Sequence, residues 1–172
     1  FLAERDFSTR GEGAWRTITY GEAARQSANL AQALIDQNCN AERPIAILSD
    51  NSIDFALLHL AAMMIGVPIM PVSSAYSLMS TDHLKLKSVI ENNDPSMIFV
   101  QDRAPFEPAL AAIDHSRITL VTGDDLAGWK ETLAGEQVEA RLAQVRPDTV
   151  AKILLTSGST GQPKGVITTQ RM

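Results

Sequence analysis

Apolar runs alternate with amphipathic segments along this chain. Thr19 and Glu22 form a capping-box pattern, and the apolar residues that follow recur at helical spacing, which predicts a helix over residues 20–37. The apolar run 44–48 predicts a strand. A polar cluster follows it and can cap a second helix, which we expect over residues 53–65.

The same alternation continues toward the C-terminus. Further strands are predicted at 67–72, 97–100, 118–121, 152–155 and 166–169, helices at 80–93, 105–113 and 125–133, and a polar surface connection at 135–150. The strands are near-continuous apolar runs without a period of two, which is typical of parallel strands that are buried on both faces. We therefore predict an α/β fold with a mostly parallel sheet and helices on both faces.

Residues 55–72 contain no charged side chain and could be mistaken for a membrane span. Gly66, Pro68 and Pro71 interrupt this stretch after three to four helical turns. We therefore expect a buried helix followed by a buried strand, and no membrane partner.

Composition narrows the class of protein. The 172 residues are 45% hydrophobic and 20% charged, which fits one folded unit. A net charge of -5 argues against nucleic acid or an anionic membrane surface as the main partner. A single cysteine, Cys39, rules out an internal disulfide framework and, without a secretory signal, predicts a cytoplasmic location. The chain begins at Phe1 and ends soon after a glycine-rich loop, so we expect it to be a fragment.

The loop between the last two predicted strands carries the chemistry. Residues 156–161 are six consecutive small residues whose amides and hydroxyls can surround a ligand, and Lys164 adds a positive charge. Residues 151–172 contain three basic residues and no acid, whereas the first 150 carry a net charge of -8. These are the features that a polyphosphate requires, whereas a flexible surface loop would not need Pro163 and Lys164 between two apolar strands.

The loop differs from the common nucleotide P-loop. Counting from Gly158, Pro163 stands where the Walker pattern needs its second glycine, and Gly165 follows Lys164 where that pattern needs a serine or threonine. A phosphotransferase of that class is therefore disfavoured.

Residues 156–166, TSGSTGQPKGV, resemble position by position the phosphate-binding signature of the adenylate-forming enzymes. This superfamily includes acyl-CoA synthetases, luciferases and peptide-synthetase adenylation domains. Residues 15–22 and 51–72 resemble two further blocks of it, so the resemblance covers essentially the whole chain. Within the family, residues 71–78 and 166–172 look most like feruloyl-CoA synthases.

The resemblance implies an acid:CoA ligase that uses ATP, Mg²⁺ and CoA, with a hydroxycinnamate such as ferulate as its acid. It implies that the β- and γ-phosphates are held by seven residues: Thr156, Ser157, Gly158, Ser159, Thr160, Gly161 and Lys164. The catalytic lysine of the C-terminal lid, the acid pocket and the adenine and ribose contacts would lie outside this partial N-terminal domain. We therefore assign no catalytic residue, and expect the 172-residue chain alone to be inactive. Nothing in the sequence indicates an oligomeric state.

The other candidate sites are better explained by structural roles than by metal binding or catalysis. His59, His83 and His115 are too widely spaced for a zinc site, and His59 is expected near the core of its helix. Asp124 and Asp125 are interpreted as a helix cap and first-turn charges. The remaining alternative for the whole chain is a non-catalytic α/β module that binds phosphate or a partner through the same loop.

Overall fold

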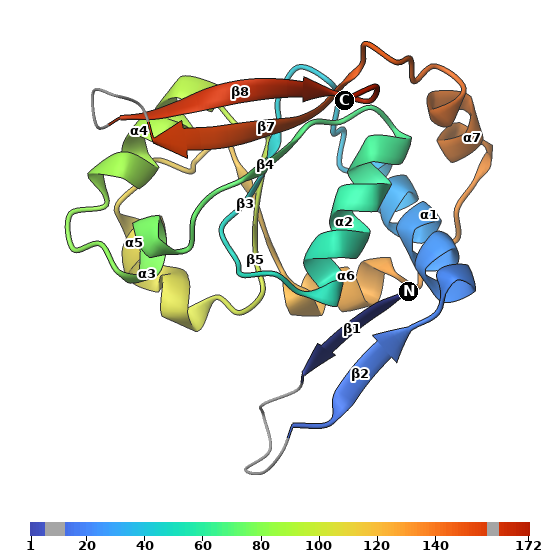
Figure 1. Cartoon of the computed structure of the whole chain (residues 1–172), viewed down its shortest axis with the longest axis horizontal. Coiled ribbons are helices and arrows are strands. Elements are labelled where there is room, and N and C mark those ends of the chain that lie inside the picture. Colours follow the sequence, from blue (N-terminus) through green and yellow to red (C-terminus); the bar gives the residue numbers. More distant parts are fainter. Residues whose placement is uncertain (6–12, 158–161) are drawn as a thin grey trace.

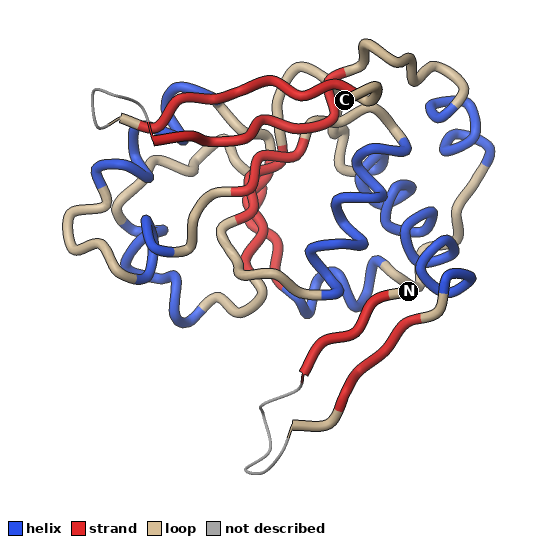
Figure 2. Tube along the Cα trace, in the orientation of Figure 1, coloured by secondary structure: helices blue, strands red, loops and turns tan. Residues whose placement is uncertain are grey.

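The fold, in a computed structural model that describes residues 1–5, 13–157 and 162–172, is built around a six-stranded sheet (Figures 1 and 2). Its spatial order is β6-β5-β3-β4-β7-β8. The strands are β3 (Ile45–Ile47), β4 (Ile69–Pro71), β5 (Met97–Val100), β6 (Thr119–Thr122), β7 (Val150–Ser157) and β8 (Pro163–Thr169). All neighbours pair in parallel except β7 and β8, which form an antiparallel hairpin, so the predicted mostly parallel sheet is confirmed.

Helices cover both faces of this sheet (Figure 1). One face packs against α1 (Tyr20–Asp36), α2 (Ile53–Met64), α6 (Gly123–Trp129) and α7 (Glu136–Leu142). The other packs against α3 (Ala75–Leu78), α4 (Leu84–Asn93), the short 3₁₀ helix Ala104–Phe106 and α5 (Glu107–Ala111). Side chains alternate between the two cores along each central strand: Ile45 and Ile47 belong to the first, Ala46 and Leu48 to the second. Burial on both faces explains the continuous apolar runs.

The capping box predicted for α1 is present. The Glu22 amide donates to the Thr19 hydroxyl at 3.2 Å, and the Glu22 carboxylate accepts from the Thr19 amide at 2.9 Å. The predicted helix and strand within residues 55–72 are confirmed as α2 and β4, although the strand is shorter than expected. No helix among the described residues has the length and apolar character that a bilayer crossing needs.

Two of the predicted helices begin at other residues than expected because of the residues at their N-termini. The helix predicted from residue 80 begins only at Leu84, because His83 adopts a left-handed conformation with φ of 51°. The Ser80 hydroxyl accepts from the His83 amide and the Asp82 carboxylate accepts from the Leu84 amide, which fixes this turn. The helix predicted at 125–133 instead starts at Gly123, because Thr122 rather than an aspartate is its N-cap.

Four elements described here were not predicted: α7, α3, β1 and β2. Residues 135–150 contain α7, whose Val138 joins the core and whose Arg141 donates to the carbonyl of Ile65. The short helix α3 precedes α4. At the N-terminus, β1 (Leu2–Arg5) and β2 (Trp15–Ile18) form a separate antiparallel hairpin.

Candidate functional site

The β7–β8 hairpin brings the two ends of the predicted phosphate loop together. Thr156 lies opposite Lys164, and Ser157 lies opposite Pro163, at the carboxyl end of β7. Ligands of open α/β sheets bind at this end of the strands. Gly158, Ser159, Thr160 and Gly161 lie outside the described residues.

Lys164 belongs to a strand and not to the loop, which corrects the prediction that the second strand begins at residue 166. Strand β8 starts at Pro163, so the register with β7 sets the position of Lys164. The Thr156 hydroxyl donates to the Lys164 carbonyl at 3.3 Å. Because directly opposed residues point to the same face of an antiparallel pair, the hydroxyl and the ammonium group share one side of the hairpin.

Both side chains are exposed and available to a ligand. Within the described ranges, no carboxylate lies within ion-pair distance of Lys164, whereas Arg171 at the far end of β8 pairs with Asp148 at 2.8 Å. An exposed cation without an acidic partner, beside a hydroxyl, is suited to an anionic oxygen.

Gly165 follows Lys164 at a point of close approach between the two strands. A Cβ at this position would lie 2.8 Å from the Cγ2 atom of Ile153 on β7. The glycine therefore lets β8 lie close to the apolar side chain of β7 that packs into the second core.

The histidines do not assemble a metal site: among the residues that the structure describes, no group of three or more His, Cys, Asp or Glu side chains could hold an ion. His59 is half-buried on α2, as expected. Burial and the nearby charge of Lys152 lower the pKa of its imidazole. Burial likewise raises the pKa of the Cys39 thiol, which disfavours the reactive thiolate.

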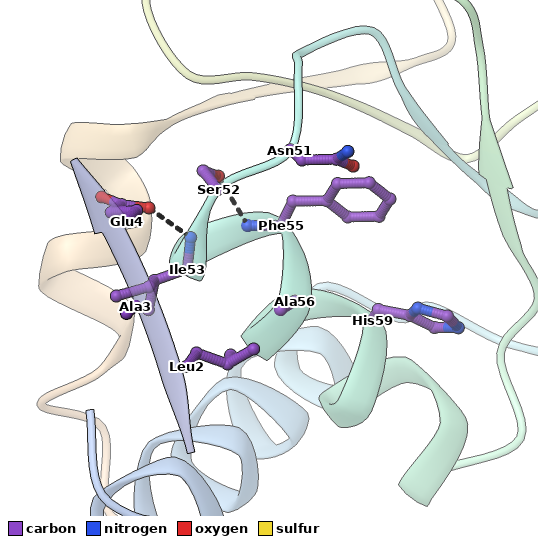
Figure 3. A pocket seen from close by; sticks show the side chains of 9 residues that line it. All are labelled: Leu2, Ala3, Glu4, Asn51, Ser52, Ile53, Phe55, Ala56 and His59. Carbon is purple, nitrogen blue, oxygen red and sulfur yellow. Dashed lines mark hydrogen bonds between the residues drawn. The ribbon is translucent and has the colours of Figure 1, made fainter. Parts of the chain in front are cut away.

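A cavity of about 390 Å³ lies between β1 and the first turns of α2 (Figure 3). Its lining is mostly apolar, with Leu2, Phe55 and Ala56 among the contributors, and the Glu4 carboxylate at one side accepts from the Ile53 amide. Neither Thr156 nor Lys164, the two described members of the predicted phosphate-binding set whose side chains are placed, lines it.

Comparisons with known proteins agree with the motif. The family model of AMP-binding enzymes matches residues 4–172. Indigoidine synthase of Streptomyces lavendulae is 30% identical over 154 residues, which are 90% of this chain and 11% of that protein. The 4-coumarate–CoA ligase-like 9 protein of Arabidopsis thaliana is 30% identical over 156 residues, which are 90% of this chain and 27% of that protein.

Among solved structures, ATP-bound MatB from Rhodopseudomonas palustris superposes with a TM-score of 0.71 at 21% identity, covering 92% of this chain and 30% of that one. The chain thus spans less than a third of each of these relatives. Their shared fold is the one described above, an α/β fold with a mostly parallel central sheet. The match over nearly the whole sequence shows that this chain belongs to the AMP-binding enzyme family, within the adenylate-forming superfamily.

Proposed function

We propose that this chain is the polyphosphate-binding part of an ATP-dependent carboxylic acid:CoA ligase that acts on a hydroxycinnamate such as ferulate. In the first step, a carboxylate oxygen of the acid attacks the α-phosphorus of ATP, and pyrophosphate leaves. In the second step, the sulfur of CoA attacks the acyl carbon, AMP leaves with the former carboxylate oxygen, and the thiol proton is released.

The observation that carries this proposal is the pairing of Thr156 and Lys164 at the carboxyl end of β7. The Lys164 ammonium, free of an acidic neighbour in the described part of the chain, would bind the β- and γ-phosphates and neutralise charge as pyrophosphate departs. Thr156 presents a hydroxyl on the same side. Gly158, Ser159, Thr160 and Gly161 belong to the same predicted set and lie outside the described residues.

Mg²⁺ would arrive with the nucleotide. In the described ranges no cluster of carboxylates exists that could hold the ion by itself. Proteins commonly bind Mg²⁺ through substrate phosphates and only one or two carboxylates, so the residues present are compatible with this mode. The cytoplasmic location stays a prediction.

The proposal also specifies the acid substrate, a hydroxycinnamate, and the acyl acceptor, CoA. Indigoidine synthase and 4-coumarate–CoA ligase-like 9 match this chain at the same identity, so overall similarity does not separate their classes. The name of the second protein refers to 4-coumarate, which is a hydroxycinnamate, and to CoA. The resemblance of residues 71–78 and 166–172 to feruloyl-CoA synthases favours a CoA ligase that acts on a hydroxycinnamate.

The test uses the full-length parent enzyme with ATP, Mg²⁺ and CoA, and follows AMP and the thioester by chromatography. We expect ferulate, p-coumarate and caffeate to support AMP release better than acetate, palmitate or amino acids. A preference for palmitate would overturn the hydroxycinnamate assignment. Adenylation of an amino acid without a CoA thioester would overturn the CoA-ligase assignment.

The alternative of a non-catalytic module predicts a different result. No acid of the panel would then support pyrophosphate exchange, although ATP could still bind. The proposal assigns the parts that position acid, adenine and CoA to residues other than these 172, so the isolated chain is expected to behave in this way in either case. The full-length protein is therefore required for the decision.

A further inference from the structure

The N-terminal hairpin β1–β2 is attached to the molecule differently from every other strand in the described part. It forms its own two-stranded sheet and makes no ladder hydrogen bonds with the six-stranded sheet. In Figure 1 the hairpin begins beside α1 and α2 and extends away from them. Side chains, and not main-chain pairing, must therefore hold it in place.

A group of four charged residues joins the hairpin to the core, and we call it the ionic cluster: Glu4, Arg16, Asp54 and Lys130. Arg16 on β2 reaches Glu4 at 2.9 Å and Asp54 at 3.6 Å. Lys130, the C-cap of α6, pairs with the same Asp54 oxygen. Glu4 also accepts from the Ile53 amide at 2.5 Å (Figure 3). The cluster thus connects the hairpin, the start of α2 and the end of α6.

Asp54 is the centre of this arrangement. Its side chain is only 5% exposed, and Gln101 at the end of β5 donates to its second oxygen at 3.0 Å. Burial pushes the pKa of this carboxyl up, but the hydrogen bonds from Lys130 and Gln101 and the charges of Lys130 and Arg16 outweigh it, so the pKa is lowered. The group is therefore a well-satisfied buried anion. Removing one of its partners leaves charge without full compensation.

Apolar attachment of the hairpin is sparse by comparison. Ile18 is buried and Leu2 is partly buried against the first core, whereas Ala3, Trp15 and Thr17 are exposed. Cavities of about 390 Å³ and about 220 Å³ flank the hairpin on the α2 side and on the Lys130 side. Figure 3 shows the side chains of β1 and α2 that line the first of them. Few packing contacts would therefore be lost if the hairpin moved.

We propose that the ionic cluster is a latch, and that the β1–β2 hairpin undocks from α2 as a unit while the six-stranded sheet stays folded. Arg16 is the residue that ties the hairpin to Asp54, because it is the cluster's basic member on the hairpin. Opening of this kind is a local event with a free energy below that of global unfolding. Loss of Arg16 weakens docking, and loss of Asp54 also frees the ends of α2 and α6.

Hydrogen exchange read by mass spectrometry on the full-length protein tests this. Arg16→Met keeps the aliphatic stem and removes the charge. We expect exchange in peptides covering Leu2–Arg5 and Trp15–Ile18 to rise about tenfold, the effect of losing a charge-assisted contact, with β3 and β5 unchanged. Arg16→Lys should restore part of the protection. The matched control is Arg103→Met, which removes an exposed ion pair with Glu107 on α5 and should leave the hairpin unchanged.

Asp54→Asn extends the test to the other elements. Exchange should rise in the hairpin and also at the first turn of α2 and the last turn of α6. If this variant does not fold, the result for Arg16→Met decides alone. Hairpin exchange that is unchanged in Arg16→Met would overturn the proposal. So would hairpin exchange that rises only in parallel with β3 and β5, since the hairpin would then open only by global unfolding.

Discussion

Two antiparallel hairpins in the described part of the chain are held by different forces. β7 continues the central sheet through its pairing with β4, and β8 adds to it by a ladder that runs from Val150 to Thr169. β1–β2 stands outside the sheet, and the ionic cluster docks it to α2 and α6 while Ile18 and Leu2 pack against the first core. Main-chain pairing thus fixes the hairpin that carries the proposed chemistry, and side chains alone dock the other.

This difference has a physical consequence. A ladder of main-chain hydrogen bonds sets the register of Thr156 and Lys164 to within one residue, since a slip would turn each side chain to the opposite face. Docking by Arg16 and Asp54 restricts the position of β1–β2 without setting any register against the sheet. Precision is therefore expected at β7–β8, and local opening at β1–β2.

The largest expected difference in stability is between a methyl group added on β8, at Gly165, and one added after β2, at Gly21 of α1. Gly165→Ala places a Cβ 2.8 Å from Ile153, so we expect a loss of about 1–3 kcal/mol in the free energy of unfolding, as in other overpacked sites. Gly21→Ala, in the first turn of α1 and three residues after the end of β2, meets nothing within 4 Å and should instead add about 0.5 kcal/mol. Chemical denaturation measures both. A neutral Gly165→Ala would show that β7 and β8 are less tightly apposed than described.

The connection between β2 and α1 offers a smaller effect. Thr19→Ala removes the hydroxyl that caps α1, and we expect a loss of about 1 kcal/mol in the free energy of unfolding. Thr17→Ala, two residues earlier on the exposed face of β2, is the matched control and should change stability by less than about 0.5 kcal/mol. Equal losses in the two variants would contradict the role of the cap.

The smallest expected effect is a dependence on pH at His59. Burial and Lys152 lower the pKa of His59 from its ordinary value of 6.5, so the unfolded chain binds this proton more readily than the folded protein. Its contribution to stability is complete above that value and is lost as the pH falls through the folded pKa. His59→Leu should therefore flatten the fall in unfolding free energy between pH 8 and pH 5, measured by denaturant titration at each pH. An unchanged slope would exclude His59 as its source.

The sheet and its main helices could be predicted from the sequence because their signals are local. The run 97–100 is a strand in the structure at the same residues, and the capping box at Thr19 places the start of α1 correctly. The predicted phosphate loop also rests on a local signal, since six small residues follow one another and Lys164 comes three positions later, and its role stays a prediction. Its flanking strands were predicted too short, because Pro163 and Lys164 extend β8 beyond its apolar residues.

The remaining features depend on contacts between distant residues. Asp54 and Lys130 are 76 positions apart, and neither has a local pattern that indicates a buried ion pair. The strands β1 and β2 are four residues each with mostly exposed side chains, so they lack an apolar run. Helix α7 is short and polar, and its place depends on Val138 and Arg141 meeting the core and the Ile65 carbonyl. Tertiary contacts, and not local propensity, stabilise these elements.

The central claim is that Lys164 binds the polyphosphate during adenylation, and acid-dependent ATP–pyrophosphate exchange by the full-length enzyme tests it most directly. Lys164→Ala should reduce the exchange rate at saturating ATP by about 10²–10³-fold, the scale for losing one group that stabilises developing charge, with little change in the unfolding midpoint. Arg171→Ala removes a cation two residues past the end of β8, at the opposite end of that strand from Lys164, and should retain wild-type exchange. An exchange rate in Lys164→Ala equal to that of wild type and Arg171→Ala would contradict the account.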